Sequence, residues 1–198
     1  MIWRVRRVVT GHDEEGRSII LSDGIAPNVK EMTPSFPGLA LTDLWETKGS
    51  PASNEGDADA ADRPVRLEPP PNGTIVRIVE FPPDSTRPQA ADGTGGFKAI
   101  GAGHAKDKHS PDPMMHRTST VDYIIVLKGE IYAVMEKGET LLKAGDVLIQ
   151  RGTNHSWSVR GNEPCIIAAI LVNSKPLKFV SRSKKKKPAA RKKTAKKK

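Results

Sequence analysis

The chain has 198 residues, which is enough for one domain with a buried core. Residues 181–198 hold eleven of the 32 Lys and Arg residues and no acid, so the first 180 residues carry 21 basic against 23 acidic side chains and the formal net charge of +9 belongs to the tail. The nearly neutral charge of the first 180 residues gives no basis for nucleic-acid binding outside the tail. The single cysteine, Cys165, excludes an intramolecular disulfide and a cysteine-rich zinc module.

The N-terminal third predicts strands separated by long polar connections. "RVRRVVTG" and "RSIILSDG" flank the acidic turn "HDEE" and predict a hairpin, without the apolar stretch of a secretory signal. "GLALTDLWET" and "GTIVRIVEFPP" are two further strand candidates. The turn-rich residues 48–64 predict a mobile surface loop, and residues 84–113 predict a second long connection, either disordered or a functional lid.

From Val121 onward, short apolar runs alternate with turns that mostly contain glycine. The runs are spaced by roughly eight to twelve residues, which is typical of an antiparallel sandwich or barrel. We therefore expect an all-β protein with three parts. Residues 1–113 add N-terminal strands and long loops to the barrel, residues 114–180 form its motif core, and residues 181–198 form a disordered basic tail.

Two sequence blocks in the motif core resemble the two motifs of the cupin superfamily, in particular its small type-2 members. The first block is "HRTSTVDYIIVLKG", residues 116–129, and the second is "GDVLIQRGTNHSW", residues 145–157. The resemblance covers about residues 114–173. It implies a β-barrel jelly roll with a metal or ligand pocket in its mouth, a fold that carries many chemistries. It also implies a possible homodimer.

The resemblance implies a metal site of two histidines and one carboxylate. His116 stands at the first histidine position of the family, Asp122 at the acid position and His155 at the histidine of the second motif, whereas Thr118 replaces the second histidine of the first motif. Two imidazoles and one carboxylate can bind one face of Fe(II), Mn, Ni or Zn and leave positions open. The alternative for Asp122 is a turn-capping acid at the end of a strand.

Three further residues are candidates for substrate contact. Thr118 shares a strand face with His116, and Trp157 shares one with His155, because side chains two apart point to the same side of a strand. Gln150 offers an amide either to a substrate or to a metal ligand. Trp157 fits plain core packing equally well.

Three functions remain open on these residues. The first is a metal-dependent enzyme that acts on a small organic molecule as an oxygenase, isomerase, decarboxylase or dehydratase. The second is a non-catalytic small-molecule-binding barrel or sensor, which the loss of a histidine at Thr118 favours. The third is a nucleic-acid-associated protein that binds through its tail.

The Lys-, Ala- and Pro-rich tail resembles the C-terminal arms of histone H1-like proteins. Such arms bind the phosphate backbone weakly and without sequence preference. We expect a soluble, cytoplasmic protein, with a nuclear or nucleoid-associated location also open through the tail, and no membrane association because no apolar stretch nears spanning length.

Overall fold

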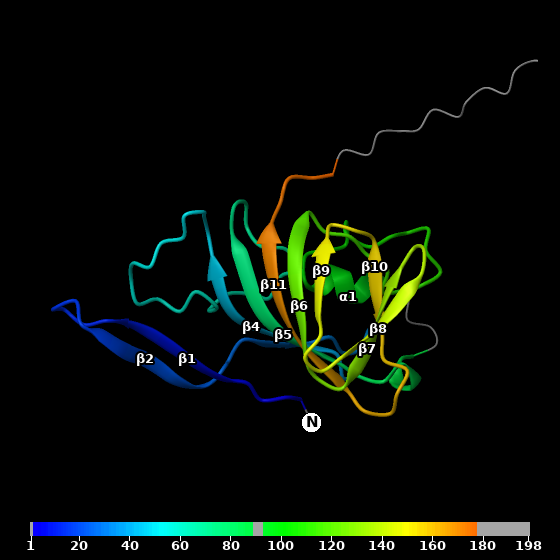
Figure 1. Ribbon diagram of the computed structural model, residues 1–198, viewed down its shortest axis with the longest axis horizontal. Helices are drawn as coiled ribbons and strands as arrows, with labels where there is room; N and C mark the ends of the chain where they lie inside the picture. Colours follow the sequence, from blue (N-terminus) through cyan, green and yellow to red (C-terminus); the bar gives the residue numbers. More distant parts are fainter. Residues whose placement is uncertain (1, 89–92, 178–198) are drawn as a thin grey trace, which may run out of the picture.

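The computed structural model describes residues 2–88 and 93–177, so the basic tail lies outside the described residues. Within them no helix is long and apolar enough to cross a membrane. The chain folds into two facing antiparallel sheets and a separate hairpin, so the all-β expectation is confirmed (Figure 1).

The larger sheet has six strands in the order β3-β4-β5-β11-β6-β9. It joins N-terminal and C-terminal parts of the chain: β3 (Val29–Glu31), β4 (Ala40–Thr47), β5 (Thr74–Phe81), β11 (Cys165–Asn173), β6 (Thr120–Lys128) and β9 (Val147–Arg151). Strand β11 pairs with β5 on one side and with β6 on the other. The N-terminal strands therefore complete the same sheet as the motif core.

The smaller sheet has three strands in the order β10-β7-β8. These are β10 (His155–Ser158), β7 (Glu130–Met135) and β8 (Glu139–Lys143). A single hydrophobic core lies between the two sheets, with Ile131 and Trp157 from the smaller sheet and Val79, Ile124 and Ile167 from the larger one. The apolar alternation of each strand produces this arrangement, because side chains two apart point to one side of a sheet.

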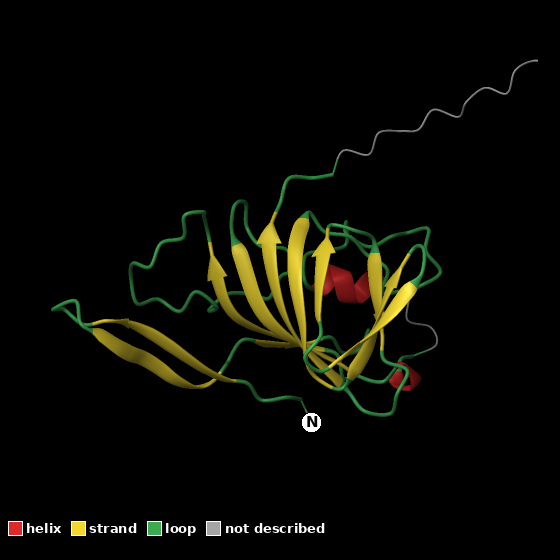
Figure 2. Ribbon diagram, viewed as in Figure 1, coloured by secondary structure: helices red, strands yellow, loops and turns green. Residues whose placement is uncertain are grey.

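The predicted N-terminal hairpin is confirmed as β1 (Arg6–His12) paired with β2 (Ser18–Ile25). Figure 2 shows it as an arm that projects away from the facing sheets. All eight residues of β2 are exposed, including the apolar Ile20 and Leu21. The hairpin therefore stands outside the core and leaves apolar side chains open to solvent.

The sequence predicted either disorder or a functional lid for the connection 84–113, of which the structure describes residues 84–88 and 93–113. The connection contains the short helices η1 (Asp84–Thr86) and α1 (Thr94–Ala99), and Phe97 and Ile100 are buried in the core. Gly93 opens α1 with a φ of 76°, and a Cβ there would lie 2.0 Å from the carbonyl oxygen of Pro113. The glycine-rich composition thus reflects close packing against the barrel rather than disorder.

Candidate functional site

A pair of buried histidines lies where the first motif meets the second. His116 and His155 form an isolated antiparallel bridge, in which each backbone N–H donates to the carbonyl oxygen of the other at 2.9 Å. Their ring centroids are 4.3 Å apart, and both residues are buried. The backbone pairing therefore brings together two side chains that are 39 positions apart in the sequence.

The hydrogen bonds of both imidazoles fix the tautomer. Nδ1 of His116 lies 2.8 Å from the carbonyl oxygen of Met114, and Nδ1 of His155 lies 2.9 Å from that of Thr153. A carbonyl oxygen only accepts, so each Nδ1 carries the proton and donates it. Both Nε2 atoms then keep a free lone pair, which is the arrangement that a metal-binding histidine needs.

Burial also keeps both imidazoles neutral. Loss of solvation lowers the pKa of His116, and it lowers the pKa of His155 to about 3, with the neighbouring His116 as a further cause. A charged imidazole is disfavoured in an apolar, water-poor environment. Both rings are therefore in the metal-binding protonation state at neutral pH.

Asp122 points into the barrel from β6, on the same face as Ile124 and Val126. Its Oδ1 is buried without a hydrogen-bond partner. Burial raises the pKa of Asp122 to about 6, opposed by a hydrogen bond from Thr120 and by the charge of Arg77. The acid at the head of this strand is thus an inward-facing group, not a solvated strand end.

The two histidines and Asp122 line one cavity of about 100 Å³ between the sheets. Most of the lining is apolar and comes from the larger sheet, α1 and β10. Across residues 2–88 and 93–177, however, no three His, Cys, Asp or Glu side chains are close enough together to form a metal-binding group. The structure brings the histidine pair together and places Asp122 in the same cavity without completing a three-residue centre.

Aromatic rings extend the histidine pair on both sides. Phe97 lies 5.0 Å from the ring of His116, and Trp157 meets the ring of His155 edge-on at 5.7 Å, measured between centroids. Trp157 lines the cavity and is also part of the core, so its core packing is observed and its contact with a substrate stays a prediction. Phe97 was not among the expected site residues, although an isolated aromatic in the glycine-rich stretch "GTGGFKAIG" is a signal for it.

The other two expected substrate contacts differ in position. Thr118 lines the cavity, and its hydroxyl lies 2.7 Å from that of Thr120. Gln150 does not line the cavity; its Nε2 donates to the hydroxyl and to the carbonyl oxygen of Thr153. That carbonyl also accepts the Nδ1–H of His155. Gln150 therefore touches the group that orients His155.

An arginine that the motifs do not contain also lines the cavity. Arg77 lies in the middle of β5, only 2% exposed, with its Nε 3.0 Å from Oδ1 of Asp43. Arg117 and Arg151, which lie within the two motif blocks, are exposed. The signal for Arg77 was a basic residue inside the apolar run "TIVRIVEF".

Cys165 and the remaining histidines take no part in the cavity. Cys165 is fully buried, and burial raises the pKa of its thiol to about 12, which disfavours the reactive thiolate. His104 is exposed and lies 2.8 Å from Oε2 of Glu68. His116 and His155 are thus the histidines relevant to the site.

Two facing antiparallel sheets define a jelly-roll β-barrel protein (Figure 2). A cavity of about 100 Å³ lies between them. The family model for the cupin domain matches residues 104–172. Oryzines biosynthesis cluster protein J from Aspergillus oryzae is 30% identical over 158 residues, which cover 78% of this chain and 74% of that protein. The chain belongs to the cupin superfamily.

Two other proteins illustrate the range of the similarity. The cupin-domain-containing oxidoreductase virC from Hypocrea virens is 26% identical over 183 residues, covering 88% of this chain and 78% of the relative. Among solved structures, the cupin domain of Schizosaccharomyces pombe Cnp3 matches with a TM-score of 0.42 and 10% identity, covering 87% of this chain and 90% of that one.

Proposed function

We propose that the protein is a metal-dependent cupin enzyme, of the oxidoreductase type, that acts on a small organic molecule. The observation that carries this proposal is the pair of neutral imidazoles, His116 and His155, whose Nε2 lone pairs have no hydrogen-bond partner among the described residues. The relative from Hypocrea virens is named an oxidoreductase, which supports this reaction type.

In this proposal His116 and His155 bind a divalent ion, Fe, Mn, Ni or Zn, and Asp122 supplies the carboxylate ligand. The donor types suit such an ion, and the unpartnered Oδ1 of Asp122 is a buried acceptor that still needs a donor or a cation. A bound ion supplies Lewis acidity and open coordination positions. Binding it would therefore give the buried Oδ1 of Asp122 a partner.

The rest of the site orients the ligands and excludes water. The carbonyl oxygens of Met114 and Thr153 hold the two Nδ1–H groups, and Gln150 holds Thr153. Phe97 and Trp157 cover the outer sides of the two rings. Thr118 offers the cavity a hydroxyl at the position where other cupins have a histidine, and we assign it to substrate contact.

A second candidate is a non-catalytic barrel that binds a small molecule without metal. The feature that favours it is the missing three-residue metal group among the described residues, together with a predominantly apolar cavity wall. Metal analysis of the purified protein separates the two. About one bound ion per chain that depends on both histidines supports the enzyme, whereas a metal-free barrel supports the binder.

Two partners are proposed in addition to the small molecule. A homodimer would cover the exposed apolar residues of the β1–β2 arm, such as Ile20 and Ile25. Light scattering behind a sizing column tests this: a dimer mass supports it, and a monomer mass at high concentration contradicts it. Weak binding of nucleic acid is assigned to residues 181–198, and deleting them should abolish it without changing the melting temperature.

A further inference from the structure

Arg77 occupies an unusual position for a charged residue. It lies on the inward face of β5 between Ile75 and Val79, and its side chain is 2% exposed. Its neighbours across the sheet are Asp43 on β4 and Ala169 on β11. A guanidinium in such a position is strongly destabilising unless its donors are bonded and its charge is balanced.

The hydrogen bonds of Arg77 all come from Nη2. Nε faces Oδ1 of Asp43 at 3.0 Å, and Nη2 donates to the carbonyl oxygen of Arg66 and to Oδ2 of Asp43, the latter at 3.5 Å. Nε and Nη1 are both buried without a hydrogen-bond partner, so the contact between Nε and Oδ1 of Asp43 is an ion pair. Asp43 and Arg66 thus fix the orientation of Arg77 while the Nη1 donors remain available.

The charges around Arg77 do not balance. Arg63 pairs with Asp43 at 2.9 Å and with Glu46 at 2.5 Å, and Arg66 pairs with Glu46 at 2.6 Å. The network therefore holds three guanidinium groups and two carboxylates. Asp122 is the cavity carboxylate that acts on Arg77, and the proposed function assigns it to the metal. One positive charge is then left uncompensated at the cavity wall.

We propose that Arg77 binds the carboxylate of the substrate, and that the cavity accepts small organic monocarboxylates. This inference deepens the proposed function and rests on it for the role of the bound molecule as a substrate and for the assignment of Asp122 to the metal, which leaves the charge of Arg77 unbalanced. A carboxylate offers acceptors to Nη1 and supplies the single negative charge that the network lacks. The apolar residues on the same wall, including Leu41, Val79 and Ile167, suit a short hydrocarbon chain.

A doubly charged anion such as phosphate fits this site less well. It would bring a second negative charge into a cavity whose lining is mostly apolar, where an unpaired charge is strongly disfavoured. The cavity volume of about 100 Å³ also restricts the molecule, or the part of it that enters, to a few carbon atoms. Butyrate is therefore a suitable probe, and butyramide is its uncharged counterpart of the same shape.

The test compares these two probes by calorimetric titration into the full-length protein at pH 7.5. The inference predicts that butyrate binds and that butyramide binds at least about tenfold more weakly, as expected for a lost charge-assisted hydrogen bond. Equal binding of the two probes, or no binding of either, would overturn the inference. This part of the test needs no variant.

Variants then show which arginine is responsible. Arg77→Gln should weaken butyrate binding by about ten- to a hundredfold, and Arg77→Lys, which keeps the charge but loses the forked donors, should also weaken it. Arg66→Gln is the matched control, because it removes one charge from the same network without lining the cavity. Equal losses in the Arg66 and Arg77 variants would overturn the assignment. If Arg77→Gln does not fold, Arg77→Lys decides.

Metal content of the same samples separates this inference from the proposed function. A bound metal without preference for butyrate contradicts the carboxylate site and leaves the metal enzyme standing. Selective butyrate binding that depends on Arg77, in protein that binds no metal, contradicts the enzyme and supports the carboxylate site.

Discussion

The protonation of Asp122 gives a measurable signature at the residue scale. Its pKa rises from 3.8 to about 6 on folding, so the folded state binds the proton more tightly than the unfolded state does. The linked stabilisation is present below pH 3.8 and is lost as the pH rises through 6. In metal-free protein we expect Asp122→Asn to gain up to about 3 kcal/mol of unfolding free energy relative to wild type between pH 4 and pH 7.

Urea unfolding at several pH values measures this difference. His155 contributes with the opposite sign, because its folded pKa of about 3 lies below the unfolded value of 6.5 and acid therefore destabilises the fold. This contribution is common to wild type and variant and cancels in the comparison. A difference in unfolding free energy that does not change with pH would show that Asp122 is not a buried, titrating carboxyl.

Gln150 is expected to act through Thr153 rather than on the substrate. Removing its amide in Gln150→Leu frees the carbonyl oxygen that orients His155, and such outer partners typically affect metal affinity by about tenfold or more. We predict a corresponding rise in the metal dissociation constant, measured by competition with a chelating dye. Arg151→Leu is the control, because Arg151 is the exposed neighbour of Gln150. An unchanged metal dissociation constant in Gln150→Leu would argue against the positioning role.

At the scale of elements, helix α1 is predicted to be part of the barrel and not a mobile cover. Phe97 is 5% exposed and packs against His116, so Phe97→Ala should lower the unfolding free energy by about 3 kcal/mol. The adjacent exposed residue provides the control, Lys98→Ala, with an expected change within about 0.5 kcal/mol. Equal unfolding curves for the Phe97 variant and wild type would mean that α1 does not pack in solution.

The strands were predictable from sequence, whereas α1 was not. Alternating apolar residues and glycine turns mark β6 to β11, because strand side chains alternate between core and solvent. The segment 94–99, TGGFKA, contains one large apolar residue, Phe97, which cannot define a helical period. Its burial depends on contacts with Phe36 and His116, which are remote in sequence. The pattern of apolar residues along the sequence does not predict such contacts.

The same distinction applies to the candidate site. His116, His155 and Asp122 are implied by the resemblance of the two sequence blocks to the cupin motifs, and all three line one cavity. Arg77 belongs to a strand outside the motifs, and its position beside the cavity arises from the pairing of β5 with β11. The position of Arg77 could not be predicted from the sequence, because it depends on pairing between strands that are far apart along the chain.

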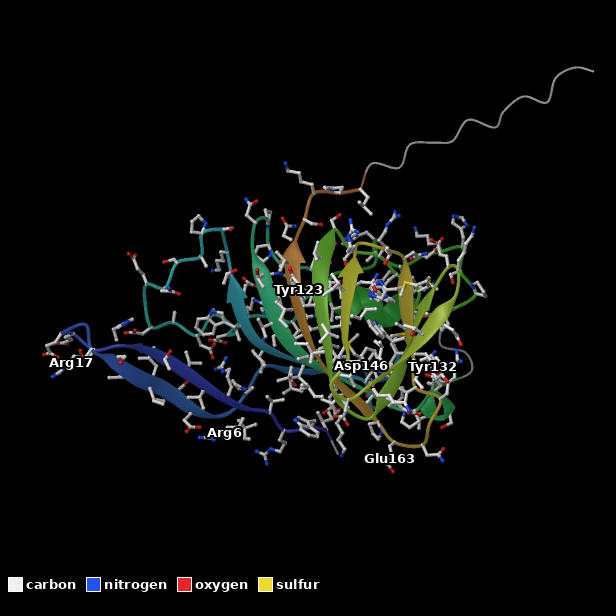
Figure 3. The ribbon with its side chains drawn as sticks, in the orientation of Figure 1. Arg6, Arg17, Tyr123, Tyr132, Asp146 and Glu163 are labelled. Atoms are coloured by element: carbon white, nitrogen blue, oxygen red, sulfur yellow. The ribbon has the colours of Figure 1, made fainter. Side chains whose placement is uncertain are left out.

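At the scale of the whole molecule, the residues of the site lie between two facing sheets. The β1–β2 arm stands apart from these sheets (Figure 3). In Figure 3 the labelled Arg6 and Arg17 lie on this arm, whereas Tyr132 and Glu163 lie on the part of the molecule that contains the smaller sheet. The arm contributes no residue to the cavity lining. We therefore expect changes confined to the arm to affect self-association without altering ligand or metal affinity. A sizing column combined with the butyrate titration on Ile20→Lys checks both, and a loss of butyrate binding would contradict this separation.

The most direct test of the account is elemental analysis of the purified full-length protein, His116→Gln and His155→Gln, with His104→Gln as a control on an exposed histidine. The account predicts about one equivalent of iron, manganese, nickel or zinc in wild type and in the His104 variant, and little in the other two. A wild-type protein that binds no metal, or variants of the histidine pair that retain it, would contradict the metal site.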